Sequence, residues 1–156
     1  MIPALRPATP EDEAFLFALY ASTRAEELEA WGLIGPQREA FLQMQFRAQQ
    51  QHYRAQLPRA DHQIVLVAGA PAGRLLVDRR EDEIRLADIA LLPEHRGRGL
   101  GTALLQALLA EAKAAARPVR LHVLHGSRAA ALYARMGFST LAADGPYVLM
   151  EWRPGG

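Results

Sequence analysis

The 156-residue chain contains no cysteine. This absence excludes disulfides, thiolate nucleophiles and zinc–cysteine sites together. A long hydrophobic run is missing too, because no apolar stretch approaches the roughly 18 residues that a membrane span needs. The opening "MIPALRPATPEDE" lacks the long apolar core of a signal peptide. We therefore expect a cytoplasmic protein with no membrane partner.

An excess of charge of one sign is also lacking, since the formal net charge is only +1. Basic residues are matched by acidic ones along the chain, which gives no case for a nucleic-acid partner. The five histidines have no ligand-like spacing with each other or with acidic residues, so we expect no metal site. Half of the residues are apolar, which suits one domain, 1–156, with a core of ordinary size.

The period of the apolar residues changes along the chain. Residues 10–57 are typical of two helices, and Thr9 is a plausible N-cap for the first. Residues 62–92 predict three strands joined by turns at "GAPAG" and "REDE". A glycine-rich segment, a helix to about Arg117, another strand, a short helix over 127–136 and a closing hairpin follow. This order predicts an α/β (α+β) fold with a mixed, mostly antiparallel sheet flanked by helices.

Three alternating glycines open the predicted helix in "EHRGRGLGT" (94–102). Each costs about 1 kcal/mol relative to alanine in a helix, so the chain should have a reason to keep them. A helix N-terminus offers unpaired N–H groups and positive partial charge, and glycine lets a ligand approach them closely. The amides of residues 97–102 could therefore hold a phosphate or pyrophosphate. Neither the P-loop nor the dinucleotide fingerprint fits this spacing. The alternative is a flexible arginine-rich surface turn.

Two motifs carry a resemblance to a known family. The segment "RGRGLG" (96–101) matches Arg/Gln-x-x-Gly-x-Gly/Ala, and "GSRAAALYARMGF" (126–138) resembles Asn-x-x-Ala-x-x-Leu-Tyr-x-x-x-Gly-Phe. Both are signatures of the GNAT superfamily of acetyl-CoA-dependent N-acetyltransferases, which the chain resembles well from about residue 62 and loosely before it. The resemblance implies an acyl-CoA N-acyltransferase fold with splayed central strands. It also implies an acetyl-CoA-binding core over 62–153 and acceptor-side helices over 10–57.

The resemblance implies acetyl-CoA as cosubstrate. Its pyrophosphate would bind the amides at 97–102, and its pantetheine arm would pair with the strand before them. The residues that would contact it are Ile89, Ala90, Leu91, Arg96, Gly97, Arg98, Gly99, Leu100, Gly101, Thr102, Gly126, Ala129 and Tyr133. Gly126 is a departure, because the family often has Asn there, and a contact made by that side chain would be lost.

Tyr133 and Asp88 are the catalytic candidates. The match to the family's tyrosine makes Tyr133 the proton donor to the departing thiolate, whereas spacing alone favours a core tyrosine with a satisfied hydroxyl. Strict alternation places Asp88 on an otherwise apolar face of a central strand. The other members of that face are Ile84, Leu86, Ala90 and Leu92.

A carboxylate on an apolar face is costly unless paired. Asp88 is therefore either a substrate-binding or basic group, as in some relatives, or one half of a buried ion pair with Arg120. Glu83, at the mouth of the strand, could act through water, although a solvated turn residue is the favoured interpretation.

The acceptor side is less informative. Glu26, Glu27 and Trp31 could receive a cationic amine through charge and cation–π contact, or form a solvated helix end with one anchoring aromatic. His122 alternates away from Leu121 and Val123, so it is a minor candidate that faces the splay between strands or is simply hydrogen-bonded.

These observations predict an enzyme that moves an acetyl group from acetyl-CoA to a primary amine by direct transfer. The amine would belong to a small molecule or a peptide. Gly126 gives slight support to a non-catalytic module that binds or senses acyl-CoA. An RNA-binding protein is disfavoured, because the charge is balanced and stacking aromatics are lacking near the arginine loop. Dimers are common in the family, so a homodimer is compatible with the resemblance.

Overall fold

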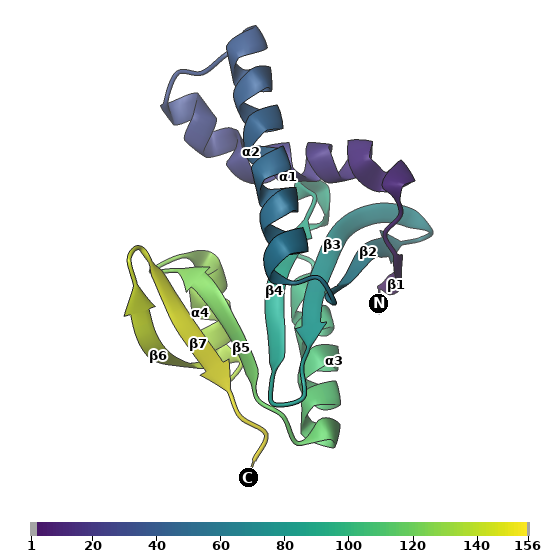
Figure 1. Ribbon diagram of the computed structural model, residues 1–156, viewed down its shortest axis with the longest axis vertical. Coiled ribbons are helices and arrows are strands. Elements are labelled where there is room, and N and C mark those ends of the chain that lie inside the picture. The colour runs from purple at the N-terminus through teal and green to yellow at the C-terminus, as the bar shows by residue number, and fades with distance from the viewer. Residues whose placement is uncertain (1–2, 156) are drawn as a thin grey trace.

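Seven strands form one sheet in the computed structural model, which describes residues 3–155 (Figure 1). The strands are β1 (Ala4–Pro7), β2 (Asp61–Val67), β3 (Ala70–Arg79), β4 (Ile84–Leu91), β5 (Val119–Leu124), β6 (Ser139–Asp144) and β7 (Tyr147–Trp152). Their order is β1-β2-β3-β4-β5-β7-β6, and every pair is antiparallel except β4 with β5. The predicted mixed, mostly antiparallel α/β fold is confirmed.

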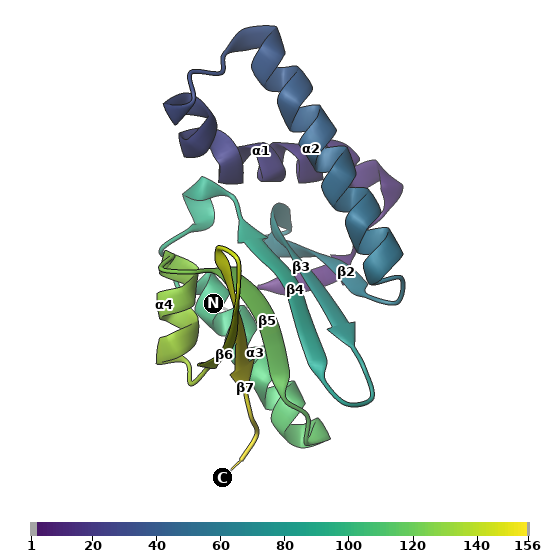
Figure 2. The ribbon, with the colours of Figure 1, turned by 60° about the vertical axis from the view of Figure 1, so that its left-hand side comes forward.

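Within the described residues, four α-helices cover the two faces of this sheet. They are α1 (Glu13–Ala30), α2 (Gly35–Gln56), α3 (Leu100–Ala115) and α4 (Arg128–Arg135), with 3-10 turns η1 (Pro10–Asp12) and η2 (Pro93–His95). Ile64 of β2 packs with Leu16 of α1 and Phe46 of α2, whereas its neighbour Val65 belongs to the cluster that contains α3. Successive strand residues point to opposite faces, so α1 and α2 lie on one face and α3 on the other (Figure 2).

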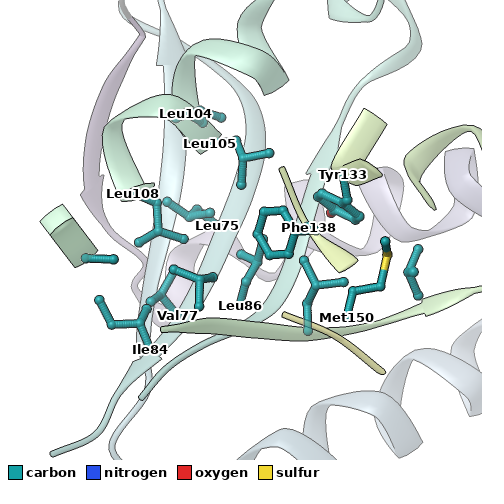
Figure 3. Packing of buried hydrophobic residues seen from close by; sticks show 14 of the residues in the cluster. Leu75, Val77, Ile84, Leu86, Leu104, Leu105, Leu108, Tyr133, Phe138 and Met150 are labelled. Atoms are coloured by element: carbon teal, nitrogen blue, oxygen red, sulfur yellow. The ribbon is translucent and has the colours of Figure 1, made fainter. Parts of the chain in front are cut away.

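The larger core lies between the sheet and the pair α3 and α4. Leu104, Leu105 and Leu108 of α3 meet the strand residues Leu75 and Val77 (Figure 3). Apolar positions three and four apart give α3 this buried stripe, because they share one face of a helix. The cluster fixes the start of α3 against the end of β4. Within residues 3–155, no helix is both long enough and apolar enough to cross a membrane.

The turn between β2 and β3 is shorter than the sequence predicts. Ala68 and Gly69 alone form it, both with positive φ, at 51° and 81°. Two such residues match the twist of a tight hairpin, so the rest of "GAPAG" belongs to β3. Gly73 is therefore a strand residue. A Cβ there would collide with the Ala90 carbonyl oxygen and with Leu91, so glycine is needed for β4 to approach β3.

Candidate active site

A wedge opens between the two parallel strands in the middle of the sheet. β4 and β5 pair only through Ile84 with Val119 and Arg85 with Arg120. Beyond that point β4 keeps its ladder with β3, and β5 keeps its ladder with β7. The two ribbons diverge in both views (Figures 1 and 2). The splayed central strands implied by the resemblance are therefore present, and one edge of residues 86–91 is free to accept a partner.

A β-bulge at Ala87 reverses the faces of β4. Val77 pairs with Leu86, but the next β3 residue, Leu76, pairs with Asp88, so Ala87 has no partner on β3. Leu86 and Ile89 therefore both face the core on the α3 side. The prediction that strict alternation places Asp88 on the face of Ile84 and Leu86 is wrong. Asp88 points to the opposite face, beneath α1 and α2.

A cavity of about 810 Å³ occupies this part of the wedge. Its walls come from α1, α2, the end of β4, the end of β5 and the start of α4. Of the residues predicted from the sequence, it is lined by Glu26, Asp88, Ile89, Ala90, Leu91, Arg96 and Ala129. Arg128 also lines it, exposed at the first position of α4. A lone arginine at a helix start forms no motif, so sequence reasoning missed it.

The glycine segment ends in a helix start with bare amides. Gly97 and Gly99 have φ of 73° and 79°, in the left-handed region that favours glycine. Helix α3 begins at Leu100, and its first backbone bond runs from the Ala103 N–H to the Gly99 carbonyl, at 3.0 Å. Within the described chain, no backbone N–H of residues 97–102 donates to a backbone carbonyl. Six successive donors therefore remain available.

The space above these amides is open. A Cβ built on Gly97, Gly99 or Gly101 would meet no heavy atom of residues 3–155 within 4 Å. Unpaired donors, an uncovered surface and the positive end of a 16-residue helix are the features that an anionic diphosphate requires. The residues present thus fit the diphosphate of coenzyme A.

Two arginines flank the amides in different ways. Arg96 donates from Nε to the Leu91 carbonyl at 2.9 Å and reaches the Ser22 hydroxyl at 3.5 Å. It thereby ties the loop to the end of β4 and to α1. Arg98 is exposed and has no ion-pair partner among residues 3–155. Thr102 is half-buried in the first turn of α3.

Tyr133 lies at the edge of the larger core, on α4. Its ring centroid is 5.5 Å from that of Phe138, and the side chain is buried (Figure 3). Burial, and secondarily the negative charge of Asp88, raise the pKa of the Tyr133 hydroxyl to about 12. The hydroxyl has no hydrogen-bond partner in the described chain. Its oxygen is not completely buried, so another molecule can reach it. It remains protonated and free to donate.

The cap residue before α4 is Ser127. Its hydroxyl accepts from the Ala130 N–H at 3.1 Å, which satisfies one of the free amides at the helix start. Gly126, just before it, has φ of 75°. Asparagine is one of the few other residues that tolerate this conformation, so the family's Asn and this Gly suit the same backbone.

Asp88 forms an ion pair, but its partner is Arg74 of β3 and not the predicted Arg120. Arg74 donates from Nε to the carboxylate oxygen Oδ2 at 2.7 Å, and its Nη2 lies 2.6 Å from the same oxygen. The bulge at Ala87 explains the difference, because it turns Asp88 toward the face that carries Arg74. The Asp88 side chain is 28% exposed and the Arg74 side chain only 5%.

Arg74 is itself held by α2. It donates to Gln49 at 3.1 Å, and its guanidinium lies 5.3 Å from the Tyr53 ring centroid. Sequence reasoning missed this arginine, although a charge inside the apolar run "GRLLV" is a signal that could have found it.

Glu83 is not the solvated turn residue that the sequence favours. It is buried and accepts from Arg85 at 2.9 Å and from Arg120 at 3.2 Å. Burial alone would raise the pKa of Glu83, but the two guanidinium groups outweigh it and hold that pKa below its usual value. Arg120 also pairs with Glu151 at 2.8 Å. These charges lie where β4 and β5 still pair.

The predicted acceptor residues are scattered. Glu26 lines the 810 Å³ cavity, whereas Glu27 is bound to Arg24 at 3.0 Å. Trp31 is 57% exposed and packs edge-on against Phe41. Trp31 and Glu27 thus have other partners and do not join Glu26 in one amine site. His122 points away from the core and lines a second cavity of about 600 Å³.

A family model described as acetyltransferase (GNAT) domain matches residues 61–140. These residues run from the start of β2 to the first residues of β6, and they include the wedge, the bulge and the glycine segment. The match covers about half of the chain.

Solved structures resemble the chain over nearly its whole length. The PaiA N-acetyltransferase of Thermoplasma acidophilum, in complex with coenzyme A, has 19% identity, coverage of 98% of this chain and 99% of that one, and a TM-score of 0.71. A structure from Corynebacterium glutamicum, described as "histone acetyltransferase HPA2 and related acetyltransferase", has 23% identity and a TM-score of 0.70. The match covers 100% of this chain and 98% of that one. An acetyltransferase from Thermus thermophilus has 22% identity, coverage of 97% and 96%, and a TM-score of 0.69. At such identities the likeness shows the fold.

Proposed function

Because the chain belongs to the GNAT acetyltransferase family, we propose that it transfers the acetyl group of acetyl-CoA directly to a primary amine. The run of unpaired amides at 97–102 beside the open edge of β4 carries this proposal. The bound coenzyme supplies the activated acetyl group as a thioester. The protein supplies position, a proton for the leaving thiolate and a route for the proton of the amine.

The amides at 97–102 hold the diphosphate in this proposal. Arg98 in the glycine segment and Arg128 in the cavity lining are exposed cations and add attraction for phosphate groups. The free edge of Ile89–Leu91 extends the grip along the pantetheine arm, because its backbone groups have no partner on the β5 side. Gly73 contributes by letting β3 and β4 approach closely behind that edge.

Tyr133 donates the proton to the thiolate. Its raised pKa keeps the hydroxyl protonated, so a donor is present throughout the neutral range. Asp88 receives the amine and its proton. Asp88 lines the cavity, and Arg74 contacts only its Oδ2, so Oδ1 has no partner in the described residues. Glu83 is a weaker candidate than Asp88, because two arginines occupy it at the closed end of the wedge.

Replacing Asp88 with asparagine should lower kcat/KM for the amine about tenfold or more near pH 7. The amide keeps the shape of the side chain but cannot take a proton. The deficit should shrink as pH rises, because more of the amine is then deprotonated before it binds. The measurement is kcat/KM from pH 6 to 10 for the wild type and for Asp88→Asn.

Asp82→Asn is the matched control, because Asp82 is exposed in the β3–β4 turn. Melting temperature and acetyl-CoA affinity report whether the loss of the pair disturbs Arg74. A wild-type pH profile that Asp88→Asn leaves unmoved would remove Asp88 from this role.

Thiol release from acetyl-CoA across a panel of primary amines tests the activity itself. We expect release that depends on the amine and is accompanied by a stoichiometric acetylated product. Tight binding of acetyl-CoA with no release for any amine would favour the non-catalytic acyl-CoA-binding module instead.

A further inference from the structure

A second cavity, of about 600 Å³, adjoins the first at Tyr147, which lines both. It lies between the C-terminal end of α2, the β3–β4 hairpin, β5 and the β6–β7 turn. Ala87, the bulge residue, lines this second cavity, while its neighbour Asp88 lines the first. The two cavities therefore meet at the bulge, where the proposed chemistry takes place.

One end of the second cavity carries two arginines with spare donors. Arg80 uses Nε for Asp78 at 2.7 Å, and Arg85 uses Nε for Glu83 at 2.9 Å. Both carboxylates belong to buried residues, Asp78 and Glu83. Within the described residues, both terminal nitrogens of Arg80 and Nη2 of Arg85 have no partner. Such fixed planar groups match a carboxylate or a phosphate.

His122 adds a donor at the same end. Nη1 of Arg85 lies 3.2 Å from its Nδ1. A guanidinium can only donate, so Nδ1 accepts this hydrogen bond and the imidazole carries its proton on Nε2.

The opposite end of the second cavity is acidic. Asp144 is the one acidic residue among the described residues of its lining, and it pairs with Tyr147 across the β6–β7 turn, at the junction of the two cavities. Tyr147 pairs with Leu124, and Arg85 with Arg120, so four residues of β5 separate the two ends. This separation is about 13 Å between Cα positions. The second cavity is thus positive where β4 and β5 pair and negative at its junction with the first cavity, whose lining includes Asp88.

We propose that the acceptor is a small amine that also carries an anionic group, a carboxylate or a phosphate, several bonds from its nitrogen. The anion binds the terminal nitrogens of Arg80 and Arg85, and the amine reaches the bulge between Asp144 and Asp88. This inference rests on the proposed function, because it concerns the acceptor half of the same site.

The test compares matched amines that differ in the anion. The pairs are 6-aminohexanoate with hexylamine, lysine with cadaverine, and phosphoethanolamine with ethanolamine; the third distinguishes phosphate from carboxylate. Thiol release from acetyl-CoA should give kcat/KM at least about tenfold higher for the anionic member of one or more pairs. Arg85→Gln and Arg80→Gln should each reduce that preference about tenfold.

Arg59→Gln is the charge-matched control, since Arg59 is exposed and lines neither cavity. Arg85→Lys retains a cation beside Glu83, so the protein should stay folded, but it removes the planar guanidinium donors. A loss of the preference in this variant therefore reflects the lost donors and not unfolding. Equal rates within every pair, or a preference that Arg80→Gln and Arg85→Gln leave intact, would overturn the inference while the acetyltransferase activity stands.

Absence of turnover with every amine would contradict the proposed function. Calorimetric titration of the same amines into the protein–coenzyme A complex then decides the inference by itself. Arg85-dependent binding of an anionic amine supports it, and no such binding overturns it.

Discussion

Replacing Gly101 with glutamate is expected to abolish coenzyme A binding while the protein stays folded. The new side chain points into open space, because a Cβ at Gly101 meets nothing within 4 Å, and its φ is not in the left-handed region. A carboxylate in the first turn of α3 suits the helix dipole, and Gly101 costs helix stability relative to other residues. The free protein should therefore be as stable as the wild type or slightly more stable.

The same carboxylate would lie against the bound diphosphate. Two like charges about 4 Å apart near a protein surface repel by about 4 kcal/mol, which is roughly a thousandfold in affinity. Calorimetric titration with coenzyme A measures the loss, and urea denaturation measures stability. Gly101→Ala is the matched control, and the family signature accepts alanine at this position. Coenzyme A affinity equal to that of the wild type in Gly101→Glu would refute the assignment of the diphosphate.

Replacing Tyr133 with phenylalanine is expected to lower kcat about a hundredfold with little change in acetyl-CoA affinity. Only the hydroxyl is removed, and the ring keeps its contact with Phe138. Because the hydroxyl has no hydrogen-bond partner in the described chain, its loss leaves no polar group unpaired. Positioned acids typically contribute a hundredfold or more to a rate. Steady-state kinetics with a saturating amine, together with calorimetry, separates kcat from binding.

The pH dependence of the activity is a second test of Tyr133 as the proton donor. A donor must be protonated, and the pKa of Tyr133 is raised to about 12. Activity should therefore not decline through the ordinary tyrosine range near pH 10, and any decline due to Tyr133 belongs near pH 12. Phe138→Leu is a control for packing, since it perturbs the neighbouring ring without touching the hydroxyl. If Tyr133→Phe retains the kcat of the wild type, Tyr133 is a core residue only.

The order of elements was predictable from the sequence, because each element has a strong local signal. The apolar patterns of β2 and β3, the leucine stripe of α3 and the short helix after β5 all lie within short windows. Gly97 and Gly99 adopt the left-handed backbone that glycine favours, whereas the sequence indicated only the close approach of a ligand. The structure contains each of these elements in the predicted order.

The orientation of Asp88 was not predictable in the same way. A bulge changes the face of every later residue in the strand, and "LADIAL" shows no glycine or proline to announce one at Ala87. The partner of Asp88 depends on that bulge, so the expected pairing with Arg120 is wrong for the same reason. Arg74 and Asp88 are 14 residues apart in the sequence, so their pairing is set by the register between β3 and β4 and not by a local sequence pattern.

The second cavity is also a product of tertiary contacts. Arg80, Arg85 and His122 come from three different strands or turns, and no spacing along the chain relates them. Their shared orientation follows from the paired ends of β4 and β5.

Amide chemical shifts measured while coenzyme A is titrated into 15N-labelled protein show which amides bind the diphosphate. The largest changes in shift should fall on residues 97–102, and pantetheine, which lacks the diphosphate, should leave those amides nearly unmoved while it shifts residues 89–91. Equal changes at 97–102 with pantetheine, or coenzyme A changes confined to other parts of the chain, would refute a diphosphate site at these amides.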